Sequence, residues 1–483
     1  MSSLKGNILL NGINTVTSIL FPIITFPYAA RVLLPSGIGI VNFQLSIINY
    51  IVLLTSLGIP LYAVKEIAKY QDNKQQRDKT AIEILFLSNI LCLAGYILVI
   101  ILAHYNTHIQ QQVLLFYILS LTILFTALGA NWFYQGIEDF KFITIRALTI
   151  RTLAAISLFI FVKDHNDILQ YGAITVGSTV GNNIINFLHL KKLISWKNIK
   201  VKSLNIFKHL KPALHIFILN LIISLYVQLN SIMLGFMQGD AAVGFFTAGT
   251  KITYVGVTLI TSLGTVLLPR CSHLIQTGDR VGFTSVINKS ILITLALAYP
   301  MVAGLLLLAG PLTMVFCGSE YIDSIPVLYW NAPVIILISL TNVMGIQVLY
   351  PQNKVNIVIL STTIGVVINL ILNLYLIPKY AATGAAIATL IAEFGVLITQ
   401  IILGKKFFPF KLSMIVRNHY IICTIIMAIG IYVITQFCNT SMQQFVYGII
   451  GGIIIYSLCL AMFKDKLASE TIQLLIKKRN RHA

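Results

Sequence analysis

Residues 131–151, NWFYQGIEDFKFITIRALTIR, decide how the rest of this sequence is interpreted. The stretch ends a long apolar run with Trp-Phe-Tyr at residues 132–134, which predicts an aromatic belt at a membrane interface. It then turns through a few charged residues and enters a second apolar run that carries Arg146 and Arg151. An arginine inside a membrane-spanning segment costs about 2.5 to 3.5 kcal/mol on insertion scales. These two side chains are therefore expected to face a water-filled cavity or a partner, and an anion is the natural partner.

The composition of the whole chain is that of a membrane protein. Of its 483 residues, 57% are hydrophobic and 10% are charged, whereas about 25% are charged in soluble domains. Since about 20 apolar residues cross a bilayer as a helix, the sequence predicts an all-α polytopic membrane protein with about 14 transmembrane helices. The predicted spans are residues 8–30, 38–62, 82–103, 112–136, 142–162, 166–190, 213–237, 245–268, 287–309, 326–349, 355–377, 381–404, 415–436 and 442–463.

The basic residues predict the orientation of the chain. If the N-terminus is cytoplasmic, the inner segments carry 28 of the 34 Lys and Arg residues and the outer loops carry 3. This asymmetry favours a multi-pass protein with both termini in the cytoplasm. The net charge of +19 is then explained by topology and by contacts with anionic membrane lipids, so it is not evidence for nucleic-acid binding.

Two short sequence matches predict an internal repeat. Residues 55–58 and 261–264 both read TSLG, at an offset of 206, and Gly172 and Gly384 begin similar small-residue stretches at an offset of 212. Two parallel six-helix repeats are a known transporter construction, with the substrate site between the lobes. The predicted organisation is an N-terminal six-helix lobe at 1–190, a basic cytoplasmic linker at 191–212, a C-terminal six-helix lobe at 213–404, and two extra helices with a basic cytoplasmic tail at 405–483.

Four cations are candidate ligands for an anionic substrate. Arg31 lies at the predicted outer mouth, Arg146 and Arg151 lie in the fifth predicted span, and Lys251 lies in the eighth. The competing interpretation is that these side chains only snorkel to the membrane surface. That alternative suits Arg31 as well as a ligand role does, and it suits Arg146, which is about one turn inside its span.

Few acids lie within the predicted spans. Glu393 is near the middle of the twelfth span and could serve as a proton-coupling group or as the partner of a buried cation. Asn230, Asn369 and Asn373 could coordinate a cation or join helices through hydrogen bonds, and the second role is favoured. The cysteine and histidine spacing predicts no metal site, and the sequence has no cofactor motif. Cys317 and Cys438, both in predicted outer loops, could form a disulfide.

Four stretches give the sequence a resemblance to a known family. They are FPYAARVL with GIGIVNF (26–43), LGIPLYAVKEIAK (57–69), ANWFYQGIEDFKFITIRAL (130–148) and LIPKYAATGAAIATLIAE (376–393). They resemble Wzx-type oligosaccharide flippases, in the polysaccharide transporter family of the multidrug/oligosaccharidyl-lipid/polysaccharide (MOP) superfamily. The resemblance implies a bacterial inner-membrane protein that moves undecaprenyl-diphosphate-linked repeat units to the outer leaflet for O-antigen, capsule or exopolysaccharide assembly.

The resemblance also implies alternating access around a cationic cavity, coupling to a proton or sodium gradient, and a polysaccharide polymerase with chain-length machinery as partners. Two alternatives belong to other classes. A small-molecule efflux antiporter of the same superfamily would favour carboxylates in its cavity. A membrane-embedded sugar polymerase or transferase would carry a large extramembrane loop, and no predicted loop here is long enough. No catalytic motif is present, so the chain is predicted not to be an enzyme.

Overall fold

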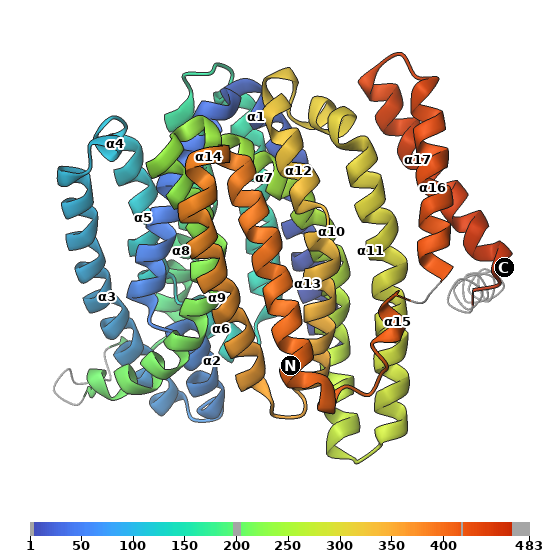
Figure 1. Ribbon diagram of the computed structural model, residues 1–483. Helices are drawn as coiled ribbons and strands as arrows, with labels where there is room; N and C mark the ends of the chain where they lie inside the picture. The colour runs from blue at the N-terminus through green and yellow to red at the C-terminus, as the bar shows by residue number, and fades with distance from the viewer. Residues whose placement is uncertain (1–3, 197–203, 417–418, 466–483) are drawn as a thin grey trace, which may run out of the picture. The chain divides into compact units, whose positions relative to one another are not determined.

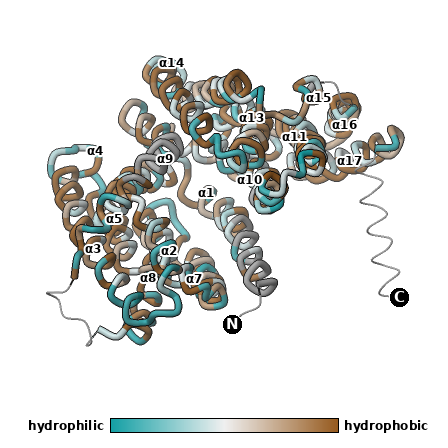
Figure 2. Tube along the Cα trace, turned by 90° about the horizontal axis from the view of Figure 1, so that it is seen from below, coloured by the Kyte–Doolittle hydropathy of each residue, from teal (hydrophilic) through white to brown (hydrophobic). Residues whose placement is uncertain are grey.

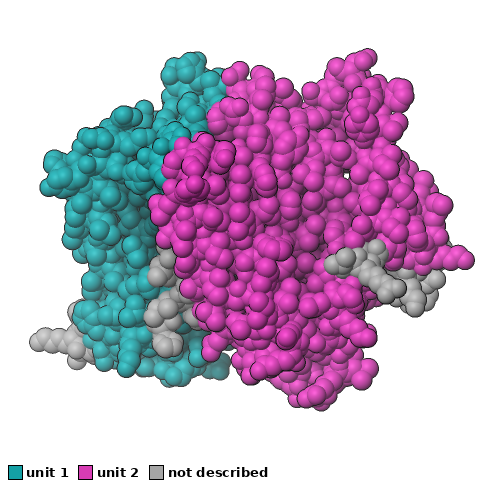
Figure 3. Space-filling view, viewed as in Figure 1, with its two compact units in different colours: residues 1–244 teal, residues 245–483 magenta. Residues whose placement is uncertain are grey.

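The computed structural model describes residues 4–196, 204–416 and 419–465, and these residues form helices joined by short turns (Figure 1). No strand occurs among them, which confirms the predicted all-α class. The chain divides into two compact units, residues 1–244 and 245–483 (Figure 3). The lobe boundaries expected from the basic linker remain a prediction.

Within the described residues of unit 1, the chain forms a series of α-helices, the 3-10 helix η3 and the first residues of α10. They are α1 (Leu4–Ser56), α2 (Ile59–Lys69), α3 (Lys74–Tyr105), α4 (Thr107–Gln110), α5 (Val113–Gly129), α6 (Asn131–Gly136), α7 (Phe140–Phe161), α8 (Ile168–Leu193), η3 (Ile206–His209), α9 (Leu210–Gln238) and the start of α10 (Asp240–Gln276).

Unit 2 begins within α10. Its other elements among the described residues are α11 (Arg280–Phe316), η4 (Ser319–Ser324), α12 (Ile325–Asn331), α13 (Val334–Asn342), the π-helix η5 (Val343–Leu349), α14 (Val355–Gly404), η6 (Lys405–Phe407), α15 (Ser413–Val416), α16 (His419–Gln436) and α17 (Ser441–Met462).

Two long helices each cover two predicted spans. α1 has 53 residues and bends at Leu34, whose φ is 61°, directly before Pro35. α14 has 50 residues and bends at Ala381, whose φ is 45°, three residues after Pro378. A proline inside a helix removes a backbone donor and favours a bend. Each pair of predicted spans is therefore joined through a kink of one residue rather than through a loop.

Among the described residues, nine helices are long and apolar enough to cross a membrane, or ten if a helix pair bent by 44° at residues 319–349 is one span. Hydrophobic residues run along most helices of each unit (Figure 2). Many of them are exposed, such as Leu93 on α3 at 68% and Ile453 on α17 at 62%. Such exposed apolar faces suit the hydrocarbon interior of a membrane. The expected total of about 14 transmembrane helices stays a prediction.

The core of unit 1 that positions the candidate site lies where α2, α3, α6 and α8 meet. Ile67, Leu87, Phe133 and Leu190 are fully or almost fully buried there. α5 packs along α8, and α1 packs against α7 and α9. In unit 2, α11 packs against the α16–α17 hairpin, while α12 and α13 pack against α14.

Candidate functional site

Residues 131–136 form the short helix α6, which packs on α2, and residues 137–139 turn into α7. Ala130 adopts a φ of 42°, which separates α5 from the short helix α6. Trp132, Phe133 and Tyr134 are all buried, so the prediction of an interfacial belt is wrong. The reason is that α6 packs on α2, and its three rings thereby fill protein core. Asp139 then accepts a hydrogen bond from the Phe142 backbone N–H at 3.1 Å and caps α7.

Arg146 lies on α7 and is 8% exposed, so the interpretation that it snorkels to the surface is wrong. Its Nε donates to Asn182 Oδ1 on α8 at 2.9 Å, and its Nη2 donates to Asn131 Oδ1 on α6 at 3.1 Å. The guanidinium carbon lies 5.5 Å from the centre of the Phe142 ring. Its Nη1 is buried with no hydrogen-bond partner among the described residues. All these contacts are neutral, so within the described part of the chain no ion pair compensates the positive charge of Arg146.

Arg151 is one turn further along α7 and is half-buried. Its Nη1 donates to the backbone oxygen of Asn14 at 3.1 Å, to Asn14 Oδ1 at 3.0 Å and to Thr17 Oγ1 at 3.0 Å. These contacts attach the first half of α1 to α7. Among the described residues, the hydrogen-bond partners of Arg151 differ from those of Arg146, so the two cations have different polar surroundings.

The other two candidate cations lie on different helices. Arg31 is exposed on α1, three residues before the bend at Leu34. Lys251 is half-buried on α10 and belongs to unit 2. A single anion site made of all four cations therefore stays a prediction.

The candidate ion-coupling residues are buried. Asn369 and Asn373 lie one turn apart on α14, and Asn373 Nδ2 donates to Asn369 Oδ1 at 3.0 Å. Glu393 lies beyond the bend of the same helix and is 5% exposed, and Asn230 on α9 is 6% exposed. The hydrogen bond between the two α14 amides is of the kind that such i, i+4 pairs form on one helix face.

The structure shows a buried charged cluster around Glu83. The sequence pattern did not reveal its role. Glu83 on α3 is fully buried, and its Oε2 lies 2.5 Å from Lys208 Nζ and 3.0 Å from His209 Nε2. Its Oε1 accepts a hydrogen bond from the Asn205 backbone N–H at 2.9 Å. His209 Nδ1 in turn lies 2.7 Å from the Tyr62 hydroxyl on α2. Glu83 therefore fastens the chain that leads into α9 onto α2 and α3.

Asp78 makes a second attachment one turn earlier on α3. It is 2% exposed, forms an ion pair with Arg77 at 3.2 Å and accepts a hydrogen bond from the Ser195 backbone N–H at 3.0 Å. Ser195 lies two residues after the end of α8. Both described ends of the predicted basic linker are thus bound to α3 through buried carboxylates.

The His209 contact predicts a pH dependence of stability. Burial lowers the pKa of His209 below its ordinary value of 6.5. The unfolded chain therefore binds a proton at His209 more readily than the folded chain. The stability contributed by this group is complete above about pH 6.5 and is lost as the pH falls through the lowered folded-state pKa.

We expect the Tm of the purified protein in detergent to fall between pH 7 and pH 5, and to fall less in His209→Gln. His165→Gln, in an exposed loop, is the control. Equal pH slopes in wild type and His209→Gln would contradict this assignment.

Comparison with known proteins places the chain in a family. Residues 4–275, more than half of the sequence, match the family described as polysaccharide biosynthesis protein. The chain belongs to this family. It is 28% identical over 397 residues to a protein named putative O-antigen transporter from Escherichia coli strain K12, over 81% of this chain and 94% of that protein. The resemblance to Wzx-type flippases drawn from the sequence is confirmed.

Solved structures of MOP-superfamily and flippase proteins share the fold of this family member. A structure titled lipid II flippase MurJ, inward closed conformation, has a TM-score of 0.77 at 18% identity and covers 95% of this chain and 99% of its own. An inward-facing multidrug resistance MATE family transporter of the MOP superfamily has a TM-score of 0.64 at 15% identity and covers 83% of this chain and 97% of its own. With its apolar helices, the chain is a multi-pass membrane protein. Its relatives carry the names of transporters and flippases, which confirms the prediction that it is not an enzyme.

Proposed function

We propose that this protein is a flippase that moves an undecaprenyl-diphosphate-linked oligosaccharide across the bacterial inner membrane, with both termini in the cytoplasm. The observation that carries the proposal is the environment of Arg146, a buried guanidinium held by two asparagine oxygens and an aromatic ring. A charge buried without a counter-charge is costly. That cost is offset when an anion with about two charges, such as a diphosphate, passes through a site where Coulomb attraction exceeds that in water.

The chemistry of such a substrate also accounts for the other side chains. Arg31, Arg151 and Lys251 would contact the diphosphate or the sugar at different stages of its passage. Asn131 and Asn182 offer amide groups, and Phe142 offers an aromatic face, which are the groups that recognise sugars. Rocking of two lobes around the substrate, as in alternating access, would expose these groups to each leaflet in turn.

Gradient coupling would involve the buried polar residues of the second candidate set. Glu393, Asn230, Asn369 and Asn373 supply one carboxylate and three amides in low-dielectric surroundings. Such groups can bind a proton or a sodium ion whose release is linked to movement of the lobes. The substrate would then be passed to a polysaccharide polymerase and its chain-length machinery for O-antigen, capsule or exopolysaccharide assembly.

The test is translocation of a fluorescent undecaprenyl-diphosphate oligosaccharide in vesicles that contain the full-length protein. We expect Arg151→Ala and Lys251→Ala to lower the rate at least tenfold at matched protein levels, because each removes a charge-assisted contact worth about 1.4 kcal/mol or more. Lys163→Gln, an exposed loop cation, is the matched control and should translocate like wild type.

Two outcomes would count against the proposal in different ways. If wild type translocates and both substitutions leave the rate unchanged, these cations are structural and the site assignment is wrong. If wild type moves no lipid-linked sugar but exports a small organic cation, the protein is an efflux antiporter instead.

A further inference from the structure

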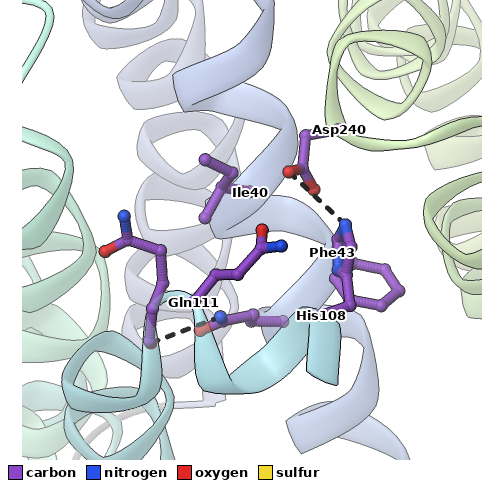
Figure 4. A pocket seen from close by; sticks show the side chains of 7 residues that line it. Ile40, Phe43, His108, Gln111 and Asp240 are labelled. Carbon is purple, nitrogen blue, oxygen red and sulfur yellow. Dashed lines mark hydrogen bonds and ion pairs between the residues drawn. The ribbon is translucent and has the colours of Figure 1, made fainter. Parts of the chain in front are cut away.

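A small polar cavity lies in unit 1 at the start of α10, away from the residues discussed above (Figure 4). Its volume is about 60 Å³. Its walls come from α1, from α4 and the turn that follows it, and from the first residue of α10. The lining residues are Ile40, Phe43, Gln44, His108, Gln111, Gln112 and Asp240.

Three polar atoms of these residues are buried with no hydrogen-bond partner in the described part of the chain. They are Gln44 Oε1, His108 Nδ1 and Asp240 Oδ1. Gln44 is 1% exposed, and its amide nitrogen makes one long hydrogen bond of 3.4 Å to the Gln112 backbone oxygen. A buried polar atom without a partner costs about 1 to 3 kcal/mol. A ligand that contacts these atoms would remove part of that cost.

Within the described residues, the Asp240 carboxylate has one contact within ion-pair distance, which involves only one of its two oxygens. Its Oδ2 lies 3.6 Å from His108 Nε2, which is longer than a hydrogen bond. The His108 ring packs edge-to-face against the Phe43 ring, with 4.8 Å between the two ring centroids, and this contact holds His108 in place. Figure 4 shows Asp240 and His108 directed toward one another across the cavity. Asp240 Oδ1 is therefore left without a partner among the described residues, and Asp240 lines the same cavity as Gln44.

The chemistry of this cavity selects its ligand. Carboxylate and amide oxygens suit hard cations, and a single carboxylate matches one positive charge better than two. A water molecule needs about 10 to 15 Å³ of such volume, so the space is large enough for an ion with a few water molecules. We propose that this cavity binds a sodium ion through Asp240 and Gln44, with water completing the coordination.

A cation here would strengthen the association of three segments. α1, α4 and the start of α10 each supply part of the wall, so the bound ion would connect them. Binding to the folded protein alone raises its stability as the ion concentration rises. The inference is independent of the proposed function, because ion binding is measured without translocation.

The experiment uses the purified full-length protein in detergent and radioactive sodium as the probe. We expect saturable sodium binding by equilibrium dialysis, and a higher Tm in sodium chloride than in choline chloride at equal ionic strength. Asp240→Asn keeps the shape of the side chain and removes its charge, so it should weaken sodium binding at least tenfold. Gln44→Leu should weaken it about threefold, because it removes one neutral ligand. Asp164→Asn, in an exposed loop, is the matched control and should bind like wild type.

Three results would overturn the inference. The first is no saturable sodium binding by wild type, which would mean that the cavity holds water alone. The second is wild-type affinity in both Asp240→Asn and Gln44→Leu. The third is loss of binding in Asn373→Ala but not in Asp240→Asn, which would place the ion at α14. If Asp240→Asn fails to fold, the Gln44→Leu affinity decides.

Discussion

Replacement of Glu83 by alanine is expected to lower the unfolding free energy by about 3 to 5 kcal/mol, because it breaks a buried ion pair by removing one partner. Glu83 is fully buried and contacts Lys208, His209 and the Asn205 backbone N–H. Its removal leaves a buried imidazole and a backbone N–H without their acceptor. Lys208 is 39% exposed, so its own lost attraction contributes less than that of the buried groups.

The measurement is thermal and denaturant unfolding of the purified protein in detergent. Glu320→Ala removes an exposed carboxylate from η4 and should change the unfolding free energy by less than about 0.5 kcal/mol. The loss of unfolding free energy in Glu83→Gln should lie between the losses in Glu83→Ala and Glu320→Ala, since the amide oxygen can still accept the hydrogen bond from the Asn205 backbone N–H. A double-mutant cycle with Lys208→Ala then separates the ion pair from the other contacts. A loss of unfolding free energy of less than about 1 kcal/mol in Glu83→Ala would contradict a stabilising role for the buried Glu83 contacts.

The sequence could predict the helical class because hydrophobic length and composition are properties of each segment by itself. The family could be predicted because NWFYQGIEDFKFITIR is distinctive as a string of residues. Neither inference required knowledge of which helices meet. The positions of the bends in α1 and α14 were harder to predict, because one residue with a positive φ at Leu34 or Ala381 replaces a loop.

Contacts between distant segments were beyond prediction from a single sequence. The burial of Trp132 and Phe133 depends on α2, and the role of Glu83 depends on residues more than 120 positions later. The contact of His108 with Asp240 joins residues 132 positions apart, and nothing near His108 in the sequence indicates this partner. For Glu83 a signal did exist, namely an acid at the start of an apolar predicted span, but it did not identify the partner residues.

The TSLG matches illustrate the same limit. In the first copy, Gly58 has a φ of 71° and lies at the start of α2, so the chain turns there. In the second copy, the helix α10 continues through Gly264. Identical residues therefore adopt different local structures, because packing around the glycine differs. The repeat itself remains a prediction.

Replacement of Gly39 by alanine is expected to destabilise the protein by about 3 kcal/mol, near the upper end of overpacking costs. A Cβ at Gly39 on α1 would lie 1.7 Å from the Asp240 backbone oxygen, and a Cβ at Gly244 on α10 would lie 2.0 Å from the Pro35 oxygen. Both clashes involve backbone, which cannot move aside as a flexible side chain can. The bend of α1 and the start of α10 can therefore approach only if both positions are glycine.

The matched control is Gly177→Ala on α8, where nothing lies within 4 Å of an added Cβ. Alanine favours a helix over glycine by about 1 kcal/mol, so the control should raise the Tm while Gly39→Ala lowers it. Because Asp240 lines the small cavity, Gly39→Ala should also weaken sodium binding, whereas Gly177→Ala should leave it unchanged. A Tm for Gly39→Ala at or above that of wild type would show that the two backbones do not make this close contact.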